Sequence, residues 1–217
     1  MSERRIDLGT VPATAAAAVL RRLETASLAC FPTDTVYGLG GAARPEVVAA
    51  LVAAKGREPD KPLQLIFPTL EVLLARVAPP PLLRAALQRL LPGAITAIIP
   101  VSSEHDVAAV VRAADGLLTL GVRVPAWPER ARLLATGEQP LVASSANLSG
   151  GRAARSLDEV PAGLRAACDL ILDAGQLPGT PSTVVDLVDY ANGGRWRVIR
   201  AGAVSITDLV AVLGSAN

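Results

Sequence analysis

Histidine and cysteine, the side chains on which many hydrolases and metal sites depend, are almost absent from this chain. The 217 residues include one histidine, His105, and two cysteines, Cys30 and Cys168. His105 follows two serines and a glutamate in a polar segment, where we expect a solvated loop. Because Ser-His-Asp and Cys-His groups need a histidine, and a structural zinc site needs clustered Cys or His ligands, the sequence argues against both.

Long apolar runs and a targeting leader are also missing. The chain begins with the polar stretch MSERRIDLGT, which is unlike a secretory signal. No apolar run reaches the ~18 residues that a membrane-spanning helix requires. Cys30 and Cys168 lie in apolar surroundings, and we expect both to be buried and reduced, as in the cytosol. We therefore expect a cytoplasmic protein that makes no contact with a membrane.

Aromatic residues are scarce, at 3% of the chain, whereas apolar residues as a whole make up 51%. The core must therefore consist of Ala, Val, Leu and Ile, a composition typical of regular α/β proteins and not of disordered ones. A chain of this length buries roughly 70% of its unfolded surface and needs no disulfide or metal to stay folded. We expect residues 1–217 to form a single domain.

Lysine occurs at two positions that lie close together. The chain has 21 basic and 20 acidic residues and a formal charge of +1, so its global charge predicts no polyanionic partner. All basic residues except Lys55 and Lys61 are arginine, and these two bracket Arg57 in the segment KGREPDK. The clustering can be chance. Alternatively, the three cations form a compact group that binds phosphate or carboxylate.

Apolar periodicity and turn residues predict alternating strands and helices. Helices begin where a capping residue or proline precedes the periodic segment, as at Thr10 with Pro12, at Pro45, and at Ser205 with Asp208. The pattern indicates an α/β (α+β) fold with a mixed sheet, but it does not give the strand order. We expect turns at 33–41 and 191–194, the second within a hairpin. We expect strands at 27–32, 63–67, 92–100, 117–125, 169–175, 182–188 and 195–200, a strand followed by a turn within 140–151, and helices at 12–26, 45–54, 70–77, 82–91, 128–137, 157–168 and 205–214.

The sequence lacks one common nucleotide-binding motif and matches another only loosely. The phosphate-binding pattern G-x-x-x-x-G-K-[ST] does not occur. Gly38, Gly40 and Ala43 satisfy the loose dinucleotide-binding pattern G-x-G-x-x-[GA], and the acidic residues Glu58 and Asp60 follow them. In a dinucleotide-binding fold that acid ends the second strand, whereas these two lie in a proline-bounded basic segment. The dinucleotide interpretation is therefore disfavoured.

Four polar segments, TDTVYG, KGREPDK, SSANLSG and PST, interrupt an otherwise apolar chain. Each adjoins a predicted strand, and the ligand-binding loops of α/β sheets gather at strand ends. Arg123 and Arg200 each lie at the end of a predicted strand and add groups that bind anions through paired hydrogen bonds. Any one segment has the composition of an ordinary turn. Together with the basic residues, the four segments predict a site for an anionic ligand.

These segments resemble the YrdC/Sua5 family, the threonylcarbamoyl-adenylate synthases. The matching stretches lie between residues 30 and 205, in the family's order: FPTDTVYGLG, KGREPDKPL, LPGAIT, GVRVPAWP, SSANLSG, PSTVVDL and VIRAGAVS. The resemblance implies a YrdC-like twisted mixed β-sheet flanked by helices, with a concave basic face. It also implies a nucleotidyltransferase that converts L-threonine, bicarbonate and ATP to threonylcarbamoyl-AMP and diphosphate, for the N6-threonylcarbamoyladenosine modification of tRNA.

The resemblance also assigns roles to individual residues. Lys55 and Arg57 would be catalytic, and Ile66 stands where some members have a polar residue. It assigns no metal ligands. The threonine site would comprise Thr33, Thr35, Arg123, Ala143 and Ser182. The nucleotide site would comprise Arg57, Lys61, Thr119, Ser145, Asn147 and Arg200.

By the same resemblance, ATP is a substrate that Mg²⁺ accompanies, and the labile product passes to a tRNA-modifying threonylcarbamoyl transferase complex. Longer members carry an additional C-terminal domain that this sequence does not contain. A related subgroup lacks the K-x-R and S-x-N elements. Both elements are present here, at Lys55 with Arg57 and at Ser145 with Asn147, which favours an active synthase.

Two other functions remain open. The family's basic face has been linked to RNA, so the chain could be a non-catalytic RNA-binding module that contacts tRNA or another RNA. Such binding would not require K-x-R and S-x-N, and two Phe, two Trp and two Tyr provide few surfaces for base stacking. The second alternative is carbamoyl transfer, as in larger hydrogenase-maturation proteins that contain a similar domain. Those proteins also carry zinc-finger and acylphosphatase-like modules, which this sequence lacks.

Overall fold

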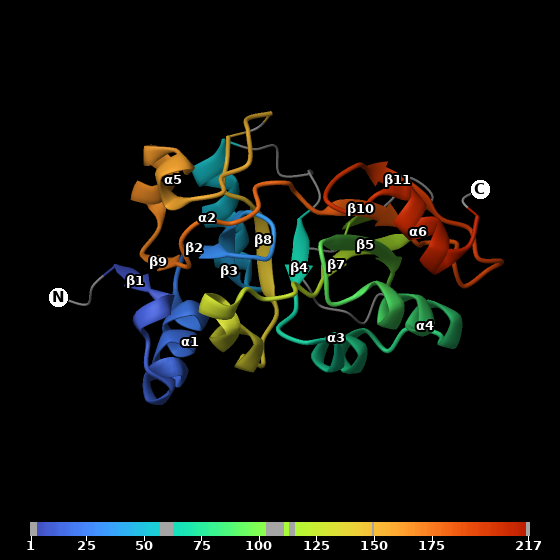
Figure 1. The fold of residues 1–217 in the computed structure, drawn as a ribbon, viewed down its shortest axis with the longest axis horizontal. Helices are drawn as coiled ribbons and strands as arrows, with labels where there is room; N and C mark the ends of the chain where they lie inside the picture. The colour runs from blue at the N-terminus through green and yellow to red at the C-terminus, as the bar shows by residue number, and fades with distance from the viewer. Residues whose placement is uncertain (1–3, 57–62, 103–110, 113–115, 149, 216–217) are drawn as a thin grey trace.

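A twisted sheet runs through the computed structural model, which describes residues 4–56, 63–102, 111–112, 116–148 and 150–215 (Figure 1). Its strands are β1 (Arg5–Asp7), β2 (Ala29–Pro32), β3 (Tyr37–Ala42), β4 (Gln64–Ile66), β5 (Ile95–Pro100), β6 (Val111–Arg112), β7 (Leu118–Arg123), β8 (Leu141–Ser145), β9 (Leu170–Asp173), β10 (Thr183–Asp186) and β11 (Arg197–Arg200). Their order is β1-β9-β2-β3-β8-β4-β7-β5-β10-β11, and β6 pairs with β7. The sheet contains parallel pairs such as β4–β7 and antiparallel pairs such as β4–β8, so the predicted mixed sheet is confirmed.

Helices pack on the sheet through two hydrophobic clusters. The α-helices are α1 (Ala16–Thr25), α2 (Pro45–Lys55), α3 (Leu70–Val77), α4 (Pro81–Leu90), α5 (Ala162–Ala167) and α6 (Ile206–Leu213), and the 3-10 helices are η1 (Leu8–Thr10), η2 (Ala13–Ala15), η3 (Glu129–Thr136) and η4 (Leu157–Glu159). The larger cluster joins α2, α3, α4, α5 and α6 to one face of the sheet. The smaller cluster joins α1 and η3 to the other face. Because the sheet is twisted, helices of the larger cluster lie above it at one end (α2, α5) and below it at the other (α3, α4) in Figure 1.

The ends of three helices follow from local sequence. Pro45 occupies the first turn of α2, where its missing N–H costs no hydrogen bond. The same helix ends at Gly56, whose φ of +54° is a left-handed conformation that favours glycine, so Lys55 lies at the carboxyl end of α2. Thr69 caps α3 by accepting a hydrogen bond from the backbone N–H of Val72 (3.3 Å). The predicted cap of α6 is confirmed, because Ser205 Oγ accepts from the Asp208 N–H (3.2 Å).

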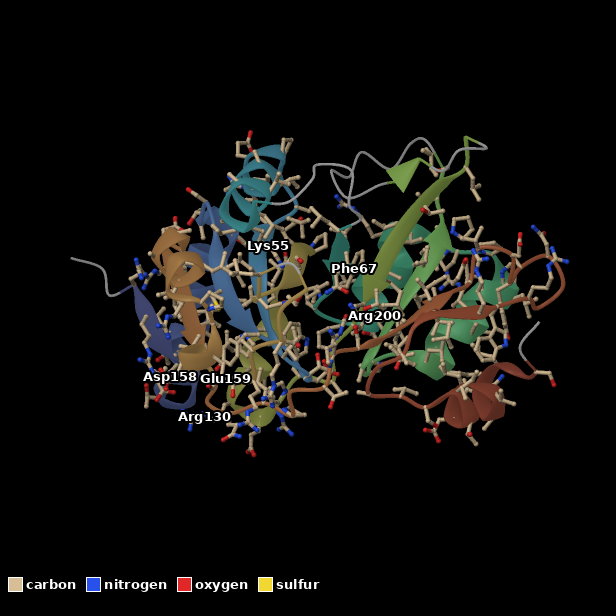
Figure 2. The ribbon with its side chains drawn as sticks, turned by 90° about the horizontal axis from the view of Figure 1, so that it is seen from above. Lys55, Phe67, Arg130, Asp158, Glu159 and Arg200 are labelled. Carbon is tan, nitrogen blue, oxygen red and sulfur yellow. The ribbon has the colours of Figure 1, made fainter. Side chains whose placement is uncertain are left out.

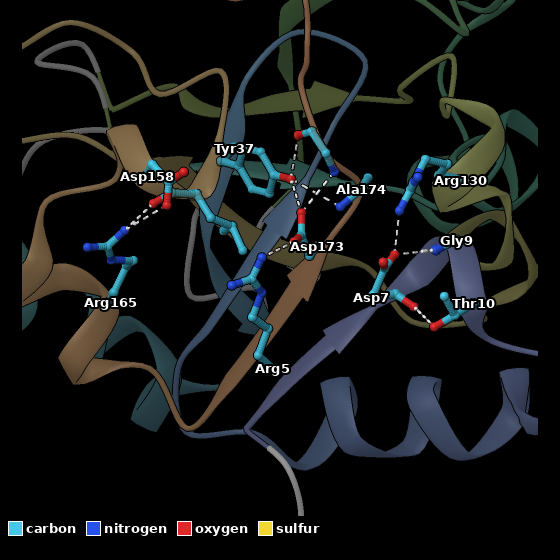
Figure 3. A network of polar contacts seen from close by, with 12 residues as sticks. Arg5, Asp7, Gly9, Thr10, Tyr37, Arg130, Asp158, Arg165, Asp173 and Ala174 are labelled. Carbon is cyan, nitrogen blue, oxygen red and sulfur yellow. Dashed lines mark hydrogen bonds and ion pairs between the residues drawn. The ribbon is translucent and has the colours of Figure 1, made fainter.

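Tyr37 fixes β3 against the end of β9 (Figure 3). Its hydroxyl contacts Asp173 Oδ1 (3.1 Å) and the Gly175 carbonyl (2.8 Å), and it accepts from the Ala174 N–H (3.0 Å). Arg5 on β1 pairs with the second oxygen of Asp173 (2.6 Å). Burial, followed by the nearby carboxylate of Asp173, raises the pKa of Tyr37 above its ordinary value. The neutral phenol therefore acts as a structural tie that holds β1, β3 and β9 together.

The predicted turn at 33–41 is wrong for its second half, which is the buried strand β3. Glycine is depleted in strands, and the run YGLGGA therefore reads as a turn. The glycines are required by close packing instead. A Cβ at Gly40 would lie 1.9 Å from the Val142 carbonyl oxygen, and a Cβ at Gly38 would lie 3.3 Å from the Phe31 ring. Both glycines sit in a strand with antiparallel neighbours, β2 and β8, so the structure agrees with the sequence in disfavouring the dinucleotide interpretation.

Smaller differences concern short elements. The helix expected at 157–168 consists of η4 and α5, which are separated at Pro161 because proline cannot continue a helix. The helix expected at 128–137 is the 3-10 segment η3. The strands β1 and β6 were not predicted, since three and two residues are too short for a periodic pattern. The hairpin around 191–194 is confirmed by the antiparallel pairing of β10 with β11.

Replacement of Gly40 by alanine is expected to lower the free energy of unfolding by about 3 kcal/mol or more, because the added carbon overlaps a backbone oxygen that cannot rotate away. Urea denaturation followed by circular dichroism measures the loss. Gly121→Ala is the matched control: it also adds a Cβ to a strand glycine, but the nearest atom would lie 3.6 Å away. Equal stability of the two variants would contradict the packing explanation.

Cys30 and Cys168 are both buried, as predicted. Burial raises the pKa of the Cys168 thiol to about 12, and it also raises the pKa of Cys30 above its ordinary value. Both side chains are therefore uncharged core residues at neutral pH. Within the residues that the structure describes, no helix combines the length and apolar character needed to cross a bilayer.

Candidate functional site

One face of the sheet carries cavity-lining residues at every second position. Thr119, Gly121 and Arg123 on β7 line a cavity, whereas the intervening Leu120 and Val122 belong to the larger hydrophobic cluster. The same alternation holds on β4 and β5, whereas Ala143, Ser144 and Ser145 of β8 all line the cavity. Because successive side chains of a strand point to opposite faces, one face of β4, β5 and β7 supplies the larger hydrophobic cluster and the other supplies the cavity. The alternating residues of β4 and β5 on the cavity face are Gln64, Ile66, Thr96 and Ile98.

The cavity has a volume of about 530 Å³, which is within the range of small-molecule sites. Hydroxyl groups and cationic side chains provide much of its polar lining. Lys55 enters from the end of α2 and Arg200 from β11, over opposite halves of the ribbon in Figure 2. No carboxylate side chain is found among the described lining residues. The cavity is therefore suited to an anionic ligand, as the sequence predicted.

Arg123 is a buried cation, with 2% of its surface exposed. Its Nη2 forms an ion pair with Asp34 and donates to Thr35 Oγ1 (2.7 Å). Burial lowers the pKa of Arg123, and the attraction of Asp34 opposes that shift. Its Nε has no hydrogen-bond partner among the described residues. A buried donor without a partner is costly, so this nitrogen is a ready binding group for a ligand acceptor such as a carboxylate oxygen.

The turn between β2 and β3 places Thr33 and Thr35 next to this arginine. Thr33 Oγ1 donates to the Val36 carbonyl (2.7 Å) and accepts from the Val36 N–H (3.3 Å). The two threonine hydroxyls lie 3.0 Å apart. Thr33 lines the cavity, whereas Thr35 lies behind it in contact with Thr33 and Arg123. Local hydrogen bonds thus hold both hydroxyls in fixed positions beside the guanidinium.

A second hydrogen-bonded chain crosses the sheet from β11 to β4. Arg200 Nη2 donates to the Ser182 carbonyl (2.8 Å) and contacts Ser182 Oγ (3.4 Å). Ser182 Oγ lies 2.9 Å from Thr96 Oγ1, and Thr96 Oγ1 donates to Gln64 Oε1 (2.8 Å). Burial lowers the pKa of Arg200. The chain links four cavity-lining residues that come from β4, β5, β11 and the segment before β10.

Lys55 joins the end of α2 to the turn that follows β8. Its Nζ donates to Ser144 Oγ (3.0 Å) and to the Ser145 carbonyl (2.6 Å). Asn147 Nδ2 donates to the carbonyls of Leu148 (2.8 Å) and Gly151 (2.7 Å). Its Oδ1 is buried and has no partner among the described residues. This turn therefore holds a buried acceptor without a described partner close to the cation of Lys55.

The structure brings most of the sequence-predicted site residues to one cavity. Thr35 lies just behind it, and Arg57 and Lys61 lie outside the described residues, as does His105. The assigned roles remain predictions. The predicted residues that line the cavity are Thr33, Lys55, Thr119, Arg123, Ala143, Ser145, Asn147, Ser182 and Arg200.

Three polar residues of this site were missed in the sequence. Asp34, the partner of Arg123, lies within the segment TDTVYG but received no role. Gln64 and Thr96 are single polar residues inside the apolar strands LQLIF and AITAII. The available signal was a polar side chain on the same strand face as its cavity-lining neighbours. An otherwise apolar strand buries such a group only where the group has hydrogen-bond partners. The apolar Ile66 lines the cavity, so a polar contact is missing there.

The lining does not fit a metal ion held by the protein. Among the described residues, no group of three His, Cys, Asp or Glu side chains is placed to bind a metal. Mg²⁺ prefers carboxylate and phosphate oxygens, and the described carboxylate that contacts Arg123, Asp34, is engaged by that arginine and by the Ala126 N–H (3.1 Å). Any divalent cation here would therefore have to arrive with its own phosphate ligands.

Comparison with known proteins identifies relatives over most of the chain. The Sua5/YciO/YrdC family model, described as "Telomere recombination", matches residues 21–202. The threonylcarbamoyl-AMP synthase of Pyrococcus abyssi is 34% identical over 192 residues, which cover 86% of this chain and 54% of that protein. The enzyme of the same name from Bacillus subtilis is 33% identical over 202 residues, covering 92% and 56%. The chain thus spans about half the length of these two relatives.

A solved structure shows the same arrangement. The crystal structure of P. abyssi Sua5 complexed with L-threonine superimposes with a TM-score of 0.77 at 30% identity, and the match covers 97% of this chain and 59% of that one. The likeness therefore includes the sheet, its flanking helices and the strands that line the cavity.

Proposed function

The chain belongs to the Sua5/YciO/YrdC family, and on that premise we propose that it is an ATP-dependent threonylcarbamoyl-AMP synthase that acts in tRNA modification. The names of its relatives and the threonine complex of the P. abyssi protein support the proposal. The observation that carries it is the cavity itself. Arg123, a buried arginine whose Nε has no partner among the described residues, lines the same cavity as Lys55 and Arg200, and the described lining includes hydroxyls but no carboxylate.

The proposed reaction needs alignment of anions more than it needs an acid or a base. Threonine's amine and bicarbonate give a carbamate and water, and a carbamate oxygen then attacks the α-phosphorus of ATP while the bond to diphosphate breaks. The products are threonylcarbamoyl-AMP and diphosphate. Such a step is accelerated when the reactants are held in line and the developing charge is stabilised. A cationic cavity whose described lining contains no histidine meets that requirement.

The cavity residues divide between the two substrates. Arg123, held by Asp34 and Thr35, would bind the threonine carboxylate through its free donor, with Thr33, Ala143 and Ser182 around the amino acid. The phosphates and nucleoside would lie toward Lys55, Thr119, Ser145, Asn147 and Arg200.

Several further features belong to the proposal. Mg²⁺ would enter as the MgATP complex, because the described lining offers no carboxylate for it. The product would be consumed by a tRNA-modifying transferase complex in the cytoplasm, and contact with tRNA itself is a less direct expectation. We also propose that residues 1–217 act as one domain, since one sheet contains strands from Arg5 to Arg200.

Release of pyrophosphate tests the proposal directly. Purified protein, ATP, Mg²⁺ and bicarbonate are combined with L-threonine, with L-serine or with no amino acid. We expect release that depends on both threonine and bicarbonate, and a product with the mass of threonylcarbamoyl-AMP. Folded protein that releases none with any amino acid would overturn the enzyme and favour the RNA-binding alternative.

A further inference from the structure

Gln64 lies in the middle of the cavity face, between the two proposed substrate sites. It is paired with Gly121 on β7 and with Ala143 on β8. Arg123 lies two residues from Gly121 in one direction along β7, and Thr119 lies two residues from it in the other. Each step is about 6.6 Å at the usual rise of a strand. Gln64 therefore occupies the row in which threonine, anchored at Arg123, must meet the nucleotide, which lies toward Thr119.

The contact with Thr96 gives the orientation of the Gln64 amide, and the hydrogen bonds that continue to Arg200 are compatible with it. Thr96 has one hydroxyl proton, and it is donated to Gln64 Oε1. In the contact between Thr96 and Ser182, Ser182 must therefore be the donor. The guanidinium of Arg200, which can only donate, closes the other end of the chain. The carbonyl oxygen of Gln64 is thus engaged by the protein, and its Nε2 is left to donate to a ligand.

Gly121 makes this arrangement possible. Gln64 has to extend from β4 across β7 to reach Thr96 on β5. A Cβ at position 121 would lie 3.6 Å from the Cβ of Gln64, so any longer side chain there would compete for the path. The absence of a side chain on β7 keeps the Gln64 amide over the centre of the cavity.

The same series of hydrogen bonds leaves Ser182 as an acceptor and Gln64 as a donor toward a ligand. The proton of Ser182 is committed to Thr96, so Ser182 offers a ligand only acceptor capacity, while Gln64 offers donors. A carbamate presents an N–H and, on the adjacent carbon, a carboxylate. These groups match Ser182 and Gln64 respectively. Lys55 and Arg200 are the cationic groups suited to phosphate, whereas a neutral amide suits a carboxylate that must stay reactive.

From these observations we propose that Gln64 Nε2 hydrogen-bonds the carboxylate that bicarbonate contributes, and so holds the carbamate toward the α-phosphate. The proposal rests on the proposed synthase function. It assigns the bicarbonate-derived group to a residue that neither the sequence motifs nor the resemblance singled out.

Gln64→Glu is the decisive variant. It retains an oxygen that accepts from Thr96, but it replaces the two donors by a charge that repels a carboxylate. We expect the KM for bicarbonate, measured in CO2-depleted buffer, to rise ~10- to 100-fold, as for loss of a hydrogen bond to a charged group. Threonine affinity measured by calorimetry without bicarbonate is expected to change less than ~3-fold, because Arg123 is untouched. Gln64→Leu, which removes the donors without adding charge, is expected to raise the same KM by a smaller factor.

Gln88→Glu is the matched control, since it adds the same charge at an exposed position on α4. We expect it to behave as the unmodified protein does. A normal KM for bicarbonate in Gln64→Glu, an increase confined to ATP, or equal losses for all three substrates would each overturn the proposal. Failure of the synthase function itself is distinguishable, because then the unmodified protein would show no threonine-dependent release of pyrophosphate.

Discussion

Replacing Arg123 by lysine is expected to lower kcat/KM for threonine by ~100- to 1000-fold, the cost of breaking a buried charge-assisted contact. The guanidinium pairs with Asp34 and Thr35 through Nη2 and keeps Nε for a ligand. The ammonium group of lysine is a single point that cannot serve three partners in this geometry. Steady-state pyrophosphate release at varied threonine, with saturating ATP and bicarbonate, measures the effect.

Lysine is chosen because it retains a positive charge beside the buried Asp34 and so limits the loss of stability. Arg89→Lys, at an exposed position on α4, is the matched control and should retain normal kinetics. The KM for ATP in Arg123→Lys should stay within ~3-fold of normal, since the nucleotide contacts other residues. A comparable increase in both KM values would show that Arg123 supports the whole cavity and does not bind threonine.

Lys55→Ala is expected to abolish turnover, with at least a ~100-fold loss in kcat/KM for ATP, because a cation that stabilises transferring phosphate contributes several kcal/mol. The side chain is largely buried, and its Nζ contacts the turn of Ser144 and Ser145. Lys55 therefore joins the phosphate side of the cavity to the end of α2. Pyrophosphate release measures the loss of turnover, and calorimetric binding of a non-hydrolysable ATP analogue measures the loss of nucleotide affinity.

The fold of this variant must be shown to persist. We expect its circular dichroism spectrum and cooperative unfolding to be retained, since an alanine at the end of α2 is compatible with the helix. Threonine binding should also persist, because Arg123 lies on β7 and Lys55 on α2. Near-normal turnover would mean that the phosphate side of the site has been placed wrongly. Loss of threonine binding together with ATP binding would mean instead that Lys55 is structural.

The sequence predicted the larger elements because their signals are local. Pro45 and Gly56 delimit α2, and Ser205 begins α6 through a cap that depends on nearby residues alone. The strand β3 was missed because the reason for its glycines is not local. Gly40 is required by the carbonyl oxygen of Val142, which lies about a hundred residues further along the chain. Strand order was inaccessible for the same reason, since pairings such as β5 with β10 depend on long-range packing.

The candidate site was predictable where polar residues form short motifs and unpredictable where they act singly. Thr33, Ser145 and Asn147 lie in recognisable segments, and the structure places them on the cavity. Gln64 and Thr96 are isolated polar residues that become connected only when β4, β7 and β5 lie side by side. The ion pair of Asp34 with Arg123 joins residues 89 positions apart. No periodicity within a single segment reports such contacts.

The alternation of cavity and core positions along β4, β5 and β7 has a consequence for how this protein can change over evolution. A point mutation at Gln64 or Thr119 alters what the cavity accepts while the hydrophobic side chains on the other face of the strand stay packed. A one-residue insertion or deletion within β7 inverts every later position of that strand. It would turn the side chain of Val122 toward the cavity and that of Arg123 toward the core. New substrate preferences are therefore reachable by substitution, and changes in length are expected to be confined to the connections between strands.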